Sequence, residues 1–269
     1  MSDLLALQRR TAIGELLARE GRVIASALAE TFRVSEDTVR RDLREMAQAG
    51  LCRRVYGGAL PIAPGADTSL GLRQAGGAGR KAALGRALAA AIPRGSLVFI
   101  DAGSTNLAIA EALDDDAALT VVTNAPSVAA RLGERPGIEC IVLGGRLDPR
   151  TGACLGSSTL REAERFRPGV AVLGVCGVDA EAGITAHGLE EAELKSAVAA
   201  RSATLLVAAT NDKLGTAAPY GVAPAGWVGT LFVEADCDAA TLEPFAARGV
   251  PIVRAGSEDA AAARPAGRA

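Results

Sequence analysis

The chain has 269 residues, of which 49% are hydrophobic and 22% charged, so it holds enough apolar material for a core and is not intrinsically disordered. Its formal net charge of -2 does not by itself indicate a nucleic-acid partner, so the placement of the charges has to decide. No apolar run reaches the roughly 20 residues that a membrane span needs, and the N-terminus lacks the features of a secretory signal, which predicts a soluble cytoplasmic protein.

Three short helices are predicted in the first 50 residues. Apolar residues recur at helical spacing within residues 7–19 and again within residues 25–32. Ser35 is placed to cap a third helix, because its side chain can accept a hydrogen bond from a first-turn amide. Glu36 and Asp37 lie in that first turn, where the helix dipole favours negative charge, and Gly50 is a usual C-terminal stop.

The third helix is predicted to have an apolar face and a basic face. At about 100° per residue, Val39, Leu43 and Met46 share one stripe. Asp37 and Thr38 lie on the other side with three arginines, Arg40, Arg41 and Arg44. A solvated charged face is the usual explanation of such a pattern. The preceding helix and the tight "RVS" turn instead favour a helix-turn-helix, whose second helix enters the DNA major groove.

A short hairpin is predicted directly after the third helix. The segment "LCRRVYGGAL" indicates a strand, a turn at Gly57-Gly58 and a returning strand. Arg53 and Arg54 add positive charge to this hairpin. It is therefore predicted to be a wing that contacts DNA phosphates.

Residues 9–60 resemble the winged helix-turn-helix of the DeoR family of bacterial transcriptional repressors. The resemblance rests on "VSEDTVRRDL" followed by "GLCRRVYGGA", and Arg33 stands in the turn where glycine is usual. It implies double-stranded operator DNA as a partner, and helix-turn-helix proteins usually dimerise, so a homodimer or higher homo-oligomer is expected. The expected DNA-binding residues are Ser35, Asp37, Thr38, Arg40, Arg41, Arg44, Arg53 and Arg54.

Beyond this DNA-binding domain, assigned to residues 1–60, the pattern changes. Residues 61–79 are rich in Pro and Gly and predict a linker. Strands and helices then alternate, which predicts an α/β domain over residues 80–256 with a mostly parallel sheet flanked by helices. The expected strands are 97–101, 119–123, 138–143, 170–175, 204–209 and 228–233, and the expected helices are 80–92, 105–113, 127–132, 157–166 and 189–201. The Ala-rich tail, 257–269, is expected to be disordered.

The segments that follow five of these strands are rich in Gly, small hydroxylated residues, Asn, Asp or Lys: "DAGSTN", "TNAPS", "LGGRLD", "GVCGVD" and "TNDK". The carboxyl ends of parallel strands share one edge of a sheet, so these segments predict a ligand site there. Gly103, Ser104 and Thr105 open a helix and predict a phosphate site, with an ordinary helix cap as the alternative. Arg146 and Lys213 can add positive charge to it.

Lys195, in "GLEEAELK", is a further candidate, and its alternative is an exposed lysine paired with Glu191 one turn earlier. His187 is the sole histidine and is expected to be a loop residue or an incidental ligand contact rather than a catalytic group. The five cysteines are scattered without a C-x-x-C pair, so neither a disulfide framework nor a metal site is expected. No cofactor is expected.

Residues 68–256 resemble the sensor domain of the same family through "IDAGSTN", "VVTNAPSVA", "VLGGRLD", "GVCGVDAEAGIT", "EEAELK" and "NDKLG". That domain is similar to ribose-phosphate isomerases and acyl-CoA transferases and typically binds a phosphorylated sugar metabolite without converting it. The chain departs from the family at Thr210, where an acid is usual, and at Cys176. The resemblance implies these effector-binding residues: Asp101, Gly103, Ser104, Thr105, Thr123, Asn124, Gly144, Gly145, Arg146, Gly177, Asp179, Lys195 and Lys213.

Together these features predict a DNA-binding transcriptional regulator, expected to be a repressor, that responds to a phosphorylated sugar. The alternative is a sugar-phosphate isomerase-like enzyme with an appended helical module, because carboxylates and lysines lie at the same sheet edge and fold does not determine function. A purely structural interaction module is a third possibility, but it leaves the five polar strand ends unexplained. An enzyme has no need of a recognition helix with three outward arginines, so no catalytic residue is expected.

Overall fold

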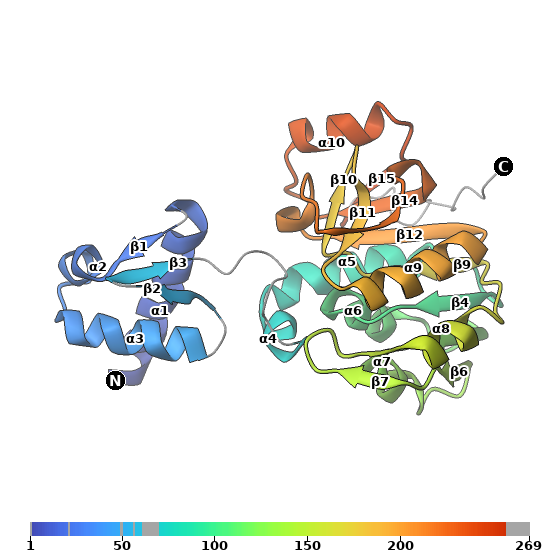
Figure 1. Cartoon of the computed structure of the whole chain (residues 1–269), viewed down its shortest axis with the longest axis horizontal. Helices are drawn as coiled ribbons and strands as arrows, with labels where there is room; N and C mark the ends of the chain where they lie inside the picture. The colour runs from blue at the N-terminus through green and yellow to red at the C-terminus, as the bar shows by residue number, and fades with distance from the viewer. Residues whose placement is uncertain (1, 21, 49–50, 56, 61–69, 257–269) are drawn as a thin grey trace. The chain divides into compact units, whose positions relative to one another are not determined.

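The computed structural model describes residues 2–20, 22–48, 51–55, 57–60 and 70–256, and the chain divides into two compact units, Met1–Leu72 and Arg73–Ala269 (Figure 1). Each unit buries its own cluster of apolar side chains. The predicted tail, 257–269, and residues 61–69 of the predicted linker lie outside the described residues. Across the described residues, no helix has the length and hydropathy needed to cross a bilayer.

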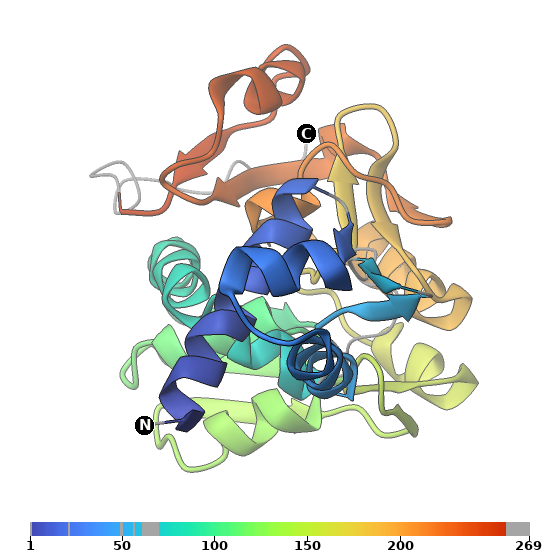
Figure 2. The same ribbon diagram turned by 90° about the vertical axis from the view of Figure 1, so that its left-hand side faces the viewer.

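The first unit packs three helices against a small antiparallel sheet (Figure 2). Val39, Leu43 and Met46 are at most 1% exposed and form the predicted apolar stripe of the third helix. The predicted wing is present as a two-stranded hairpin whose turn contains Gly57. The elements are α1 (Ser2–Glu20), β1 (Val23–Ile24), α2 (Ala25–Phe32), α3 (Glu36–Gln48), β2 (Arg53–Val55) and β3 (Gly58–Leu60).

The turn between α2 and α3 depends on Arg33. Its φ of 52° and ψ of 46° place it in the left-handed region, which explains why glycine is usual here and why an arginine carries strain of about 1–2 kcal/mol. Ser35 then caps α3, because its hydroxyl oxygen accepts a hydrogen bond from the Thr38 amide at 3.2 Å. The predicted helix-turn-helix and its cap are therefore confirmed.

A nearly buried ion pair joins α1 to α3. Arg9 Nε lies 2.5 Å from Asp42 Oδ2, and the two side chains are 13% and 2% exposed. The hydrogen bond to Asp42 raises the pKa of Arg9, and burial only partly offsets this. A second pair, between Arg10 and Glu45, is more exposed, at 29% and 45%. Both ion pairs join α1 to α3 and differ mainly in burial, so comparing them isolates the effect of burial on the contribution of an ion pair to stability.

Replacing Arg9 with Leu is expected to destabilise the first unit by about 2 kcal/mol, because Asp42 stays buried without its counter-charge. Arg10→Leu is the control and should cost less than about 1 kcal/mol, since exposed pairs contribute little. Urea unfolding of the full chain followed by circular dichroism reports both units, whereas the fluorescence of Trp227, the sole tryptophan, reports only the second. Equal destabilisation by the two substitutions would contradict this prediction.

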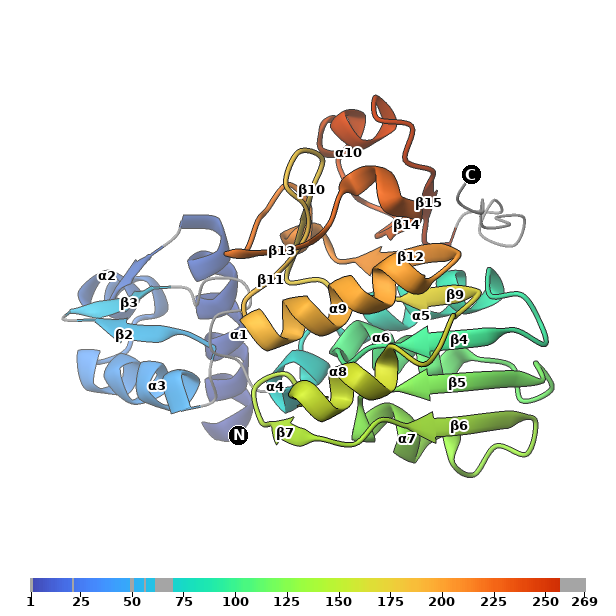
Figure 3. The same cartoon turned by 45° about the vertical axis from the view of Figure 1, so that its right-hand side comes forward.

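The second unit is built on a seven-stranded sheet in which every neighbouring pair is parallel (Figure 3). The strand order is β15-β14-β12-β9-β4-β5-β6, and β15 is the one strand not predicted. The central strands are apolar because both faces are covered, and all six residues of β12 are buried. The strands are β4 (Leu97–Ile100), β5 (Leu119–Thr123), β6 (Ile138–Val142), β9 (Val170–Val172), β12 (Thr204–Ala209), β14 (Val228–Val233) and β15 (Ile252–Arg254).

Helices cover both faces of this sheet. Three helices that pack on one another, α5, α6 and α7, lie on one face, and α8 and α9 lie on the other (Figure 3). The predicted α/β architecture is therefore confirmed. The helices are α5 (Ala78–Ala90), α6 (Ser104–Ala112), α7 (Pro126–Leu132), α8 (Ser157–Ala163), α9 (Leu189–Arg201) and α10 (Ala239–Ala246).

Several small elements were not predicted. Residues 70–79, which composition assigned to a linker, instead form α4 (Leu70–Ala75) and the first residues of α5. Two short antiparallel sheets also form, one from β7 (Arg146–Asp148) and β8 (Ala153–Leu155), the other in the order β10-β11-β13. The remaining elements are β10 (Gly177–Asp179), β11 (Gly183–Ala186), β13 (Tyr220–Ala223) and the 3-10 helices η1 (Asn211–Lys213) and η2 (Ala225–Trp227).

Candidate functional site

The order of the parallel strands reverses between β4 and β9. The chain runs from β4 through β5 to β6 and then returns to place β9 on the other side of β4. At such a switch point the two connections leave the sheet in opposite directions, and ligands bind in the crevice beyond the carboxyl ends of the strands. Asp101 directly follows β4, and Gly174 lies two residues after β9. The predicted site residue Asp101 therefore lies where the fold itself favours binding.

The loop after β4 opens α6 as predicted. Gly103 has a φ of 151°, a conformation that favours glycine, and the helix begins at Ser104 without a side-chain cap. The Leu107 amide donates to the Gly103 carbonyl at 2.9 Å, so the amides of Ser104 and Thr105 precede the first bonded turn. These amides and the helix dipole suit an anion.

Helix α5 brings a lysine to the same loop. It packs closely on α6, since a Cβ built on Gly85 would lie 2.5 Å from the Ala108 carbonyl oxygen. Helix α5 leads into β4 and α6 leaves it, so both begin at the carboxyl edge and run in parallel. Lys81 precedes Gly85 by one turn of α5, and Ser104 precedes Ala108 by one turn of α6. Lys81 and Ser104 therefore lie at the same height along the two parallel helices. No motif marks Lys81; only this packing register does.

Lys81 belongs to a group of cations. Burial lowers its pKa, the carboxylate of Asp212 opposes that shift, and three nearby cations add to it, namely Arg73, Arg80 and Lys213. Its ammonium donates to the carbonyls of Arg73 and, at 2.6 Å, of Gly76. The segment with linker composition thus contributes positive charge to the sheet edge.

Lys195 is buried, with 2% of its surface exposed, so the alternative of an exposed helix lysine is wrong. Its ammonium meets three acceptors: the Gly174 carbonyl at 2.7 Å, Asp101 Oδ2 at 3.2 Å and the Glu191 carboxylate. Burial opposes a charge here, but Asp101 and Glu191 outweigh it and raise the pKa of Lys195. Lys195 is therefore protonated, and its three protons are all donated within the protein.

The pKa values of the two carboxylates beside Lys195 shift in opposite directions. Burial raises the pKa of Asp101 by more than the charge of Lys195 lowers it. Burial acts on Glu191 in the same sense, but Lys195 outweighs it and holds the pKa of Glu191 below its usual value. The Cys176 thiol lies 3.9 Å from Glu191 Oε1, and burial raises its pKa, so it is a neutral, unreactive thiol. Sequence reasoning named Glu191 only as a partner of Lys195.

Thr123 and Asn124, at the end of β5, are both fully buried. The Thr123 hydroxyl donates to the Ile100 carbonyl at 2.6 Å and accepts from the Ala125 amide at 3.0 Å, so it ties β5 to β4. The Asn124 side-chain amide donates to the Cys154 carbonyl at 3.3 Å. Thr123 therefore shapes the edge of the site rather than offering a free group.

Three predicted residues lie in the connection after β6. Gly144 is held by α8, because the Thr159 hydroxyl donates to its carbonyl at 2.6 Å, and Gly145 lies against the same side chain. Arg146 begins β7, is 64% exposed and forms an ion pair with Glu190 at the start of α9. The charge of Arg146 is thus already matched by a carboxylate.

Two predicted residues belong to the β10–β11 hairpin. Gly177 begins β10, and Asp179 ends it at the hairpin turn, where its Oδ1 accepts from the amides of Glu181 and Ala182 at 2.8 and 2.9 Å. These hydrogen bonds lower the pKa of Asp179 and give it a structural role in the turn. Lys213, in η1 after β12, lies 3.4 Å from the Asp212 carboxylate.

The exposed face of α3 carries the predicted DNA-binding arginines. Arg40 Nη2 lies 2.7 Å from Glu36 Oε2, so this guanidinium is held by its own helix. Arg41 and Arg44 are exposed, and neither takes part in an ion pair within the part of the chain that the structure describes. The Ser35 hydroxyl is engaged in the cap, and Arg53 and Arg54 lie on β2 of the wing.

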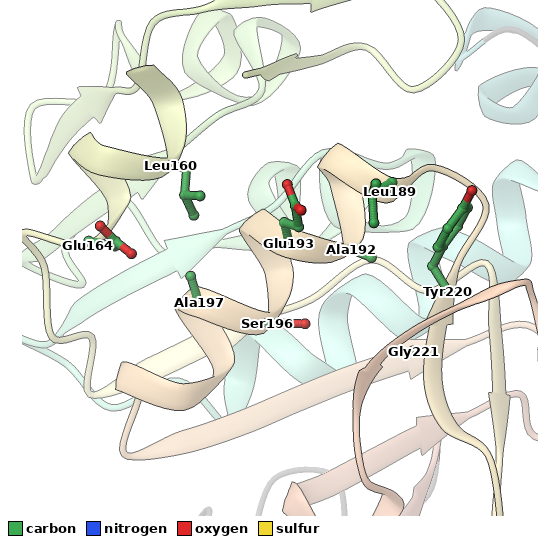
Figure 4. Close-up of a pocket in the computed structure, with 9 residues that line it drawn as sticks. All are labelled: Leu160, Glu164, Leu189, Ala192, Glu193, Ser196, Ala197, Tyr220 and Gly221. Carbon is green, nitrogen blue, oxygen red and sulfur yellow. The ribbon is translucent and has the colours of Figure 1, made fainter. Parts of the chain in front are cut away.

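Neither a metal site nor an outer groove competes with the switch-point site. No cluster of three or more His, Cys, Asp or Glu suited to a metal occurs among the described residues. A groove on the outer face of α8 and α9 has no cation in its lining, so it does not suit an anionic ligand (Figure 4). It is lined by Leu160, Glu164, Leu189, Ala192, Glu193, Ser196, Ala197, Tyr220 and Gly221.

Comparison with known proteins gives matches in both units. A DeoR-like helix-turn-helix domain matches residues 9–64, and a DeoR C terminal sensor domain matches residues 78–235. The glycerol-3-phosphate regulon repressor of Escherichia coli K12 is 32% identical over 228 residues, which cover 85% of this chain and 90% of that protein. The HTH-type transcriptional repressor GlcR of Bacillus subtilis is 29% identical over 228 residues, which cover 84% and 88%.

Solved structures are more distant. Ribose 5 phosphate isomerase A from Neisseria gonorrhoeae aligns with a TM-score of 0.36 and 17% identity over 49% of this chain and 52% of that one. The full-length sorbitol operon regulator SorC from Klebsiella pneumoniae aligns with a TM-score of 0.32 and 12% identity over 77% and 89%. Likenesses at this level have no bearing on function.

Proposed function

This chain belongs to the DeoR family of transcriptional regulators, and we propose that its second unit binds a phosphorylated sugar metabolite that changes its affinity for operator DNA. The chain is a DNA-binding regulator related to named repressors, which decides against the isomerase-like enzyme. One observation supports the proposal most strongly. The first turn of α6, which has no side-chain cap, and Lys81 of α5 lie at the same height at the carboxyl edge of the sheet, beside the switch point.

A phosphate group fits this place on chemical grounds. The first-turn amides of α6 and the hydroxyls of Ser104 and Thr105 are donors, and Lys81 and Lys213 add positive charge. Hydrogen bonds to a charged group contribute about 1.5–3 kcal/mol each, so an uncharged hydroxyl in place of the phosphate should bind far more weakly. One relative is named for the repression of a glycerol-3-phosphate regulon, which agrees with a phosphorylated effector.

We also propose that α3 enters the major groove with Arg41 and Arg44 directed to DNA, while Arg53 and Arg54 of the wing meet phosphates. Arginine can bind guanine in a bidentate manner or pair with phosphate. A homodimer or higher homo-oligomer would present two such helices to two operator half-sites. The effector would act by binding more tightly to one of two states that differ in DNA affinity.

Substituting both Ser104 and Thr105 with Ala should preserve operator binding but raise the effector concentration needed for half-maximal release by at least about 100-fold, because two hydrogen bonds to the charged phosphate are lost. The measurement is an operator titration by fluorescence anisotropy with glycerol 3-phosphate, glucose 6-phosphate and ribose 5-phosphate, each beside its dephosphorylated form.

The control is the double substitution of Ser157 and Ser158 with Ala. These residues follow Gly156 and open α8 after β8, a strand of the separate two-stranded sheet, so they repeat the glycine-hydroxyl arrangement at a strand that is not part of the main sheet. This control should respond like the wild type. Equal release of both double variants by the same ligand would place the anion site elsewhere, and a lack of response to every phosphorylated compound would contradict the effector proposal.

A further inference from the structure

Four buried acceptor oxygens at the carboxyl edge of the main sheet have no hydrogen-bond donor among the described residues. They are Asn106 Oδ1, Asn124 Oδ1, Asn211 Oδ1 and Glu234 Oε1. A fifth buried oxygen without a partner, Ser127 Oγ, belongs to a hydroxyl that can donate as well as accept, and the second oxygen of Glu234 pairs with Arg80. Asn124, Asn211 and Glu234 come just after the ends of β5, β12 and β14, and Asn106 lies in the first turn of α6, the helix after β4. The four oxygens therefore come from four separate connections on one edge of the sheet. Buried polar atoms are rarely left without a partner, and four along one edge call for a common explanation.

The orientations of the three asparagine amides are set by their nitrogens. Asn106 Nδ2 donates to the Asp101 carbonyl at 2.9 Å, and Asn124 Nδ2 donates to the Cys154 carbonyl at 3.3 Å. Asn211 Nδ2 donates to Asp236 Oδ1 at 3.0 Å. A flipped amide would place oxygen against oxygen in each case, so the unpartnered atoms are acceptors by assignment of the network.

The buried cluster beside Asn106 offers acceptors as well. Lys195 donates its three protons to Gly174, Asp101 and Glu191, so it has none left for a ligand. What the cluster can present is the carboxylate oxygen of Glu191, the least buried of its three charged side chains at 10% exposed. Lys195, which the sequence predicts to bind the effector, therefore holds the Glu191 carboxylate in place as a hydrogen-bond acceptor.

We propose that the part of the effector outside its phosphate is rich in hydroxyl donors and carries no carboxylate, and that Glu191 with the edge asparagines enforces this choice. A hydroxyl can donate to Glu191 or to an asparagine oxygen, whereas a carboxylate has no proton to donate and faces a like charge at Glu191. The inference rests on the proposed function, and it narrows the effector to phosphorylated polyols and sugars, excluding phosphorylated sugar acids.

The test uses pairs of ligands that share a phosphate ester and differ at one end. Glycerol 3-phosphate is compared with 3-phosphoglycerate, and sorbitol 6-phosphate with 6-phosphogluconate, on the full chain. Operator release and the melting temperature followed by Trp227 fluorescence are both recorded. For the pair to which the protein responds, the carboxylate member should need at least about 100-fold higher concentration, since a site built of hydrogen-bond acceptors rejects ligands that lack the matching donors.

Glu191→Gln removes the negative charge and supplies an N–H that can donate to a carboxylate. The ratio of the concentrations needed for the two ligands of a pair should therefore fall below about 10-fold. Glu193→Gln is the matched control, because Glu193 is an exposed residue of the same helix that lines the outer groove and not the cluster; the concentration ratio of the two ligands should stay at its wild-type size. Equal potency of the two members on the wild type would overturn the inference without touching the phosphate site. An unchanged ratio in Glu191→Gln would overturn the role of Glu191, and a failure of all four compounds in both readouts would count against the proposed function itself.

Discussion

Replacing Lys195 with Met is expected to destabilise the second unit by about 3–5 kcal/mol. Methionine keeps most of the side-chain volume, but Asp101 and Glu191 then stay buried without a counter-charge, and removing one partner of a buried pair has this magnitude of effect. The measurement is urea unfolding followed by Trp227 fluorescence. Lys213→Met is the control, because its partner Asp212 is 54% exposed, and it should cost less than about 1 kcal/mol.

The loss of folding stability in Lys195→Met should also depend on pH. Without the lysine, burial is the largest influence on the two carboxylates, and together with the repulsion between them it should raise the pKa of each above its unfolded value. The folded variant then binds protons more readily than the unfolded chain, so it loses stability as the pH rises above about 4. The destabilisation relative to wild type should therefore be smaller at pH 5 than at pH 7. A penalty that is the same at both values would contradict the buried-charge explanation.

Substituting both Arg41 and Arg44 with Ala is expected to weaken operator binding by about 2–6 kcal/mol, if the two losses of about 1–3 kcal/mol add. Both side chains are exposed, so the fold of the first unit should be unaffected. Arg40→Ala is the comparison within the same helix. It should cost less than either single variant, because Glu36 already holds its guanidinium.

Salt titrations separate the roles of the two arginines. Loss of a phosphate contact should lower the slope of log affinity against log salt by about one, whereas loss of a base contact should relax specificity at one operator position. An operator affinity unchanged in the double variant would reject α3 as the recognition helix. A larger loss for Arg40→Ala than for Arg41→Ala would show that the ion pair with Glu36 opens on DNA.

The parts of the structure that sequence predicted are those that depend on local patterns. The stripe of Val39, Leu43 and Met46 follows from helical spacing, and the cap at Ser35 follows from its own hydroxyl. Six of the seven strands of the main sheet are apolar runs bounded by polar turns, so the sequence predicts them to within a few residues. The strand predicted over residues 170–175 ends early, at Val172, and Lys195 holds the Gly174 carbonyl just beyond it.

The parts that sequence did not predict depend on packing between elements. Whether Lys195 faces solvent depends on which side of α9 lies on the sheet, and the small side chains of that helix mark no strong apolar face. Lys81 reaches the site only through the close approach of α5 and α6 at Gly85. Helix α4 has no sustained periodicity, and Arg73 within it is held by distant carbonyls, those of Arg150 and Thr151. None of these contacts leaves a pattern in the chain.

The uncapped start of α6 has a consequence for how regulators of this architecture can diverge. Its amides belong to the backbone, so no substitution of Ser104 or Thr105 other than proline removes them, and the helix dipole persists with any sequence that keeps the helix. The acceptors of Glu191 and Asn124 are side chains, which a single codon change can replace. In the proposed mode of binding, phosphate recognition and selection of the attached metabolite therefore depend on different parts of the chain, so a new ligand preference could evolve while the phosphate site stays unchanged.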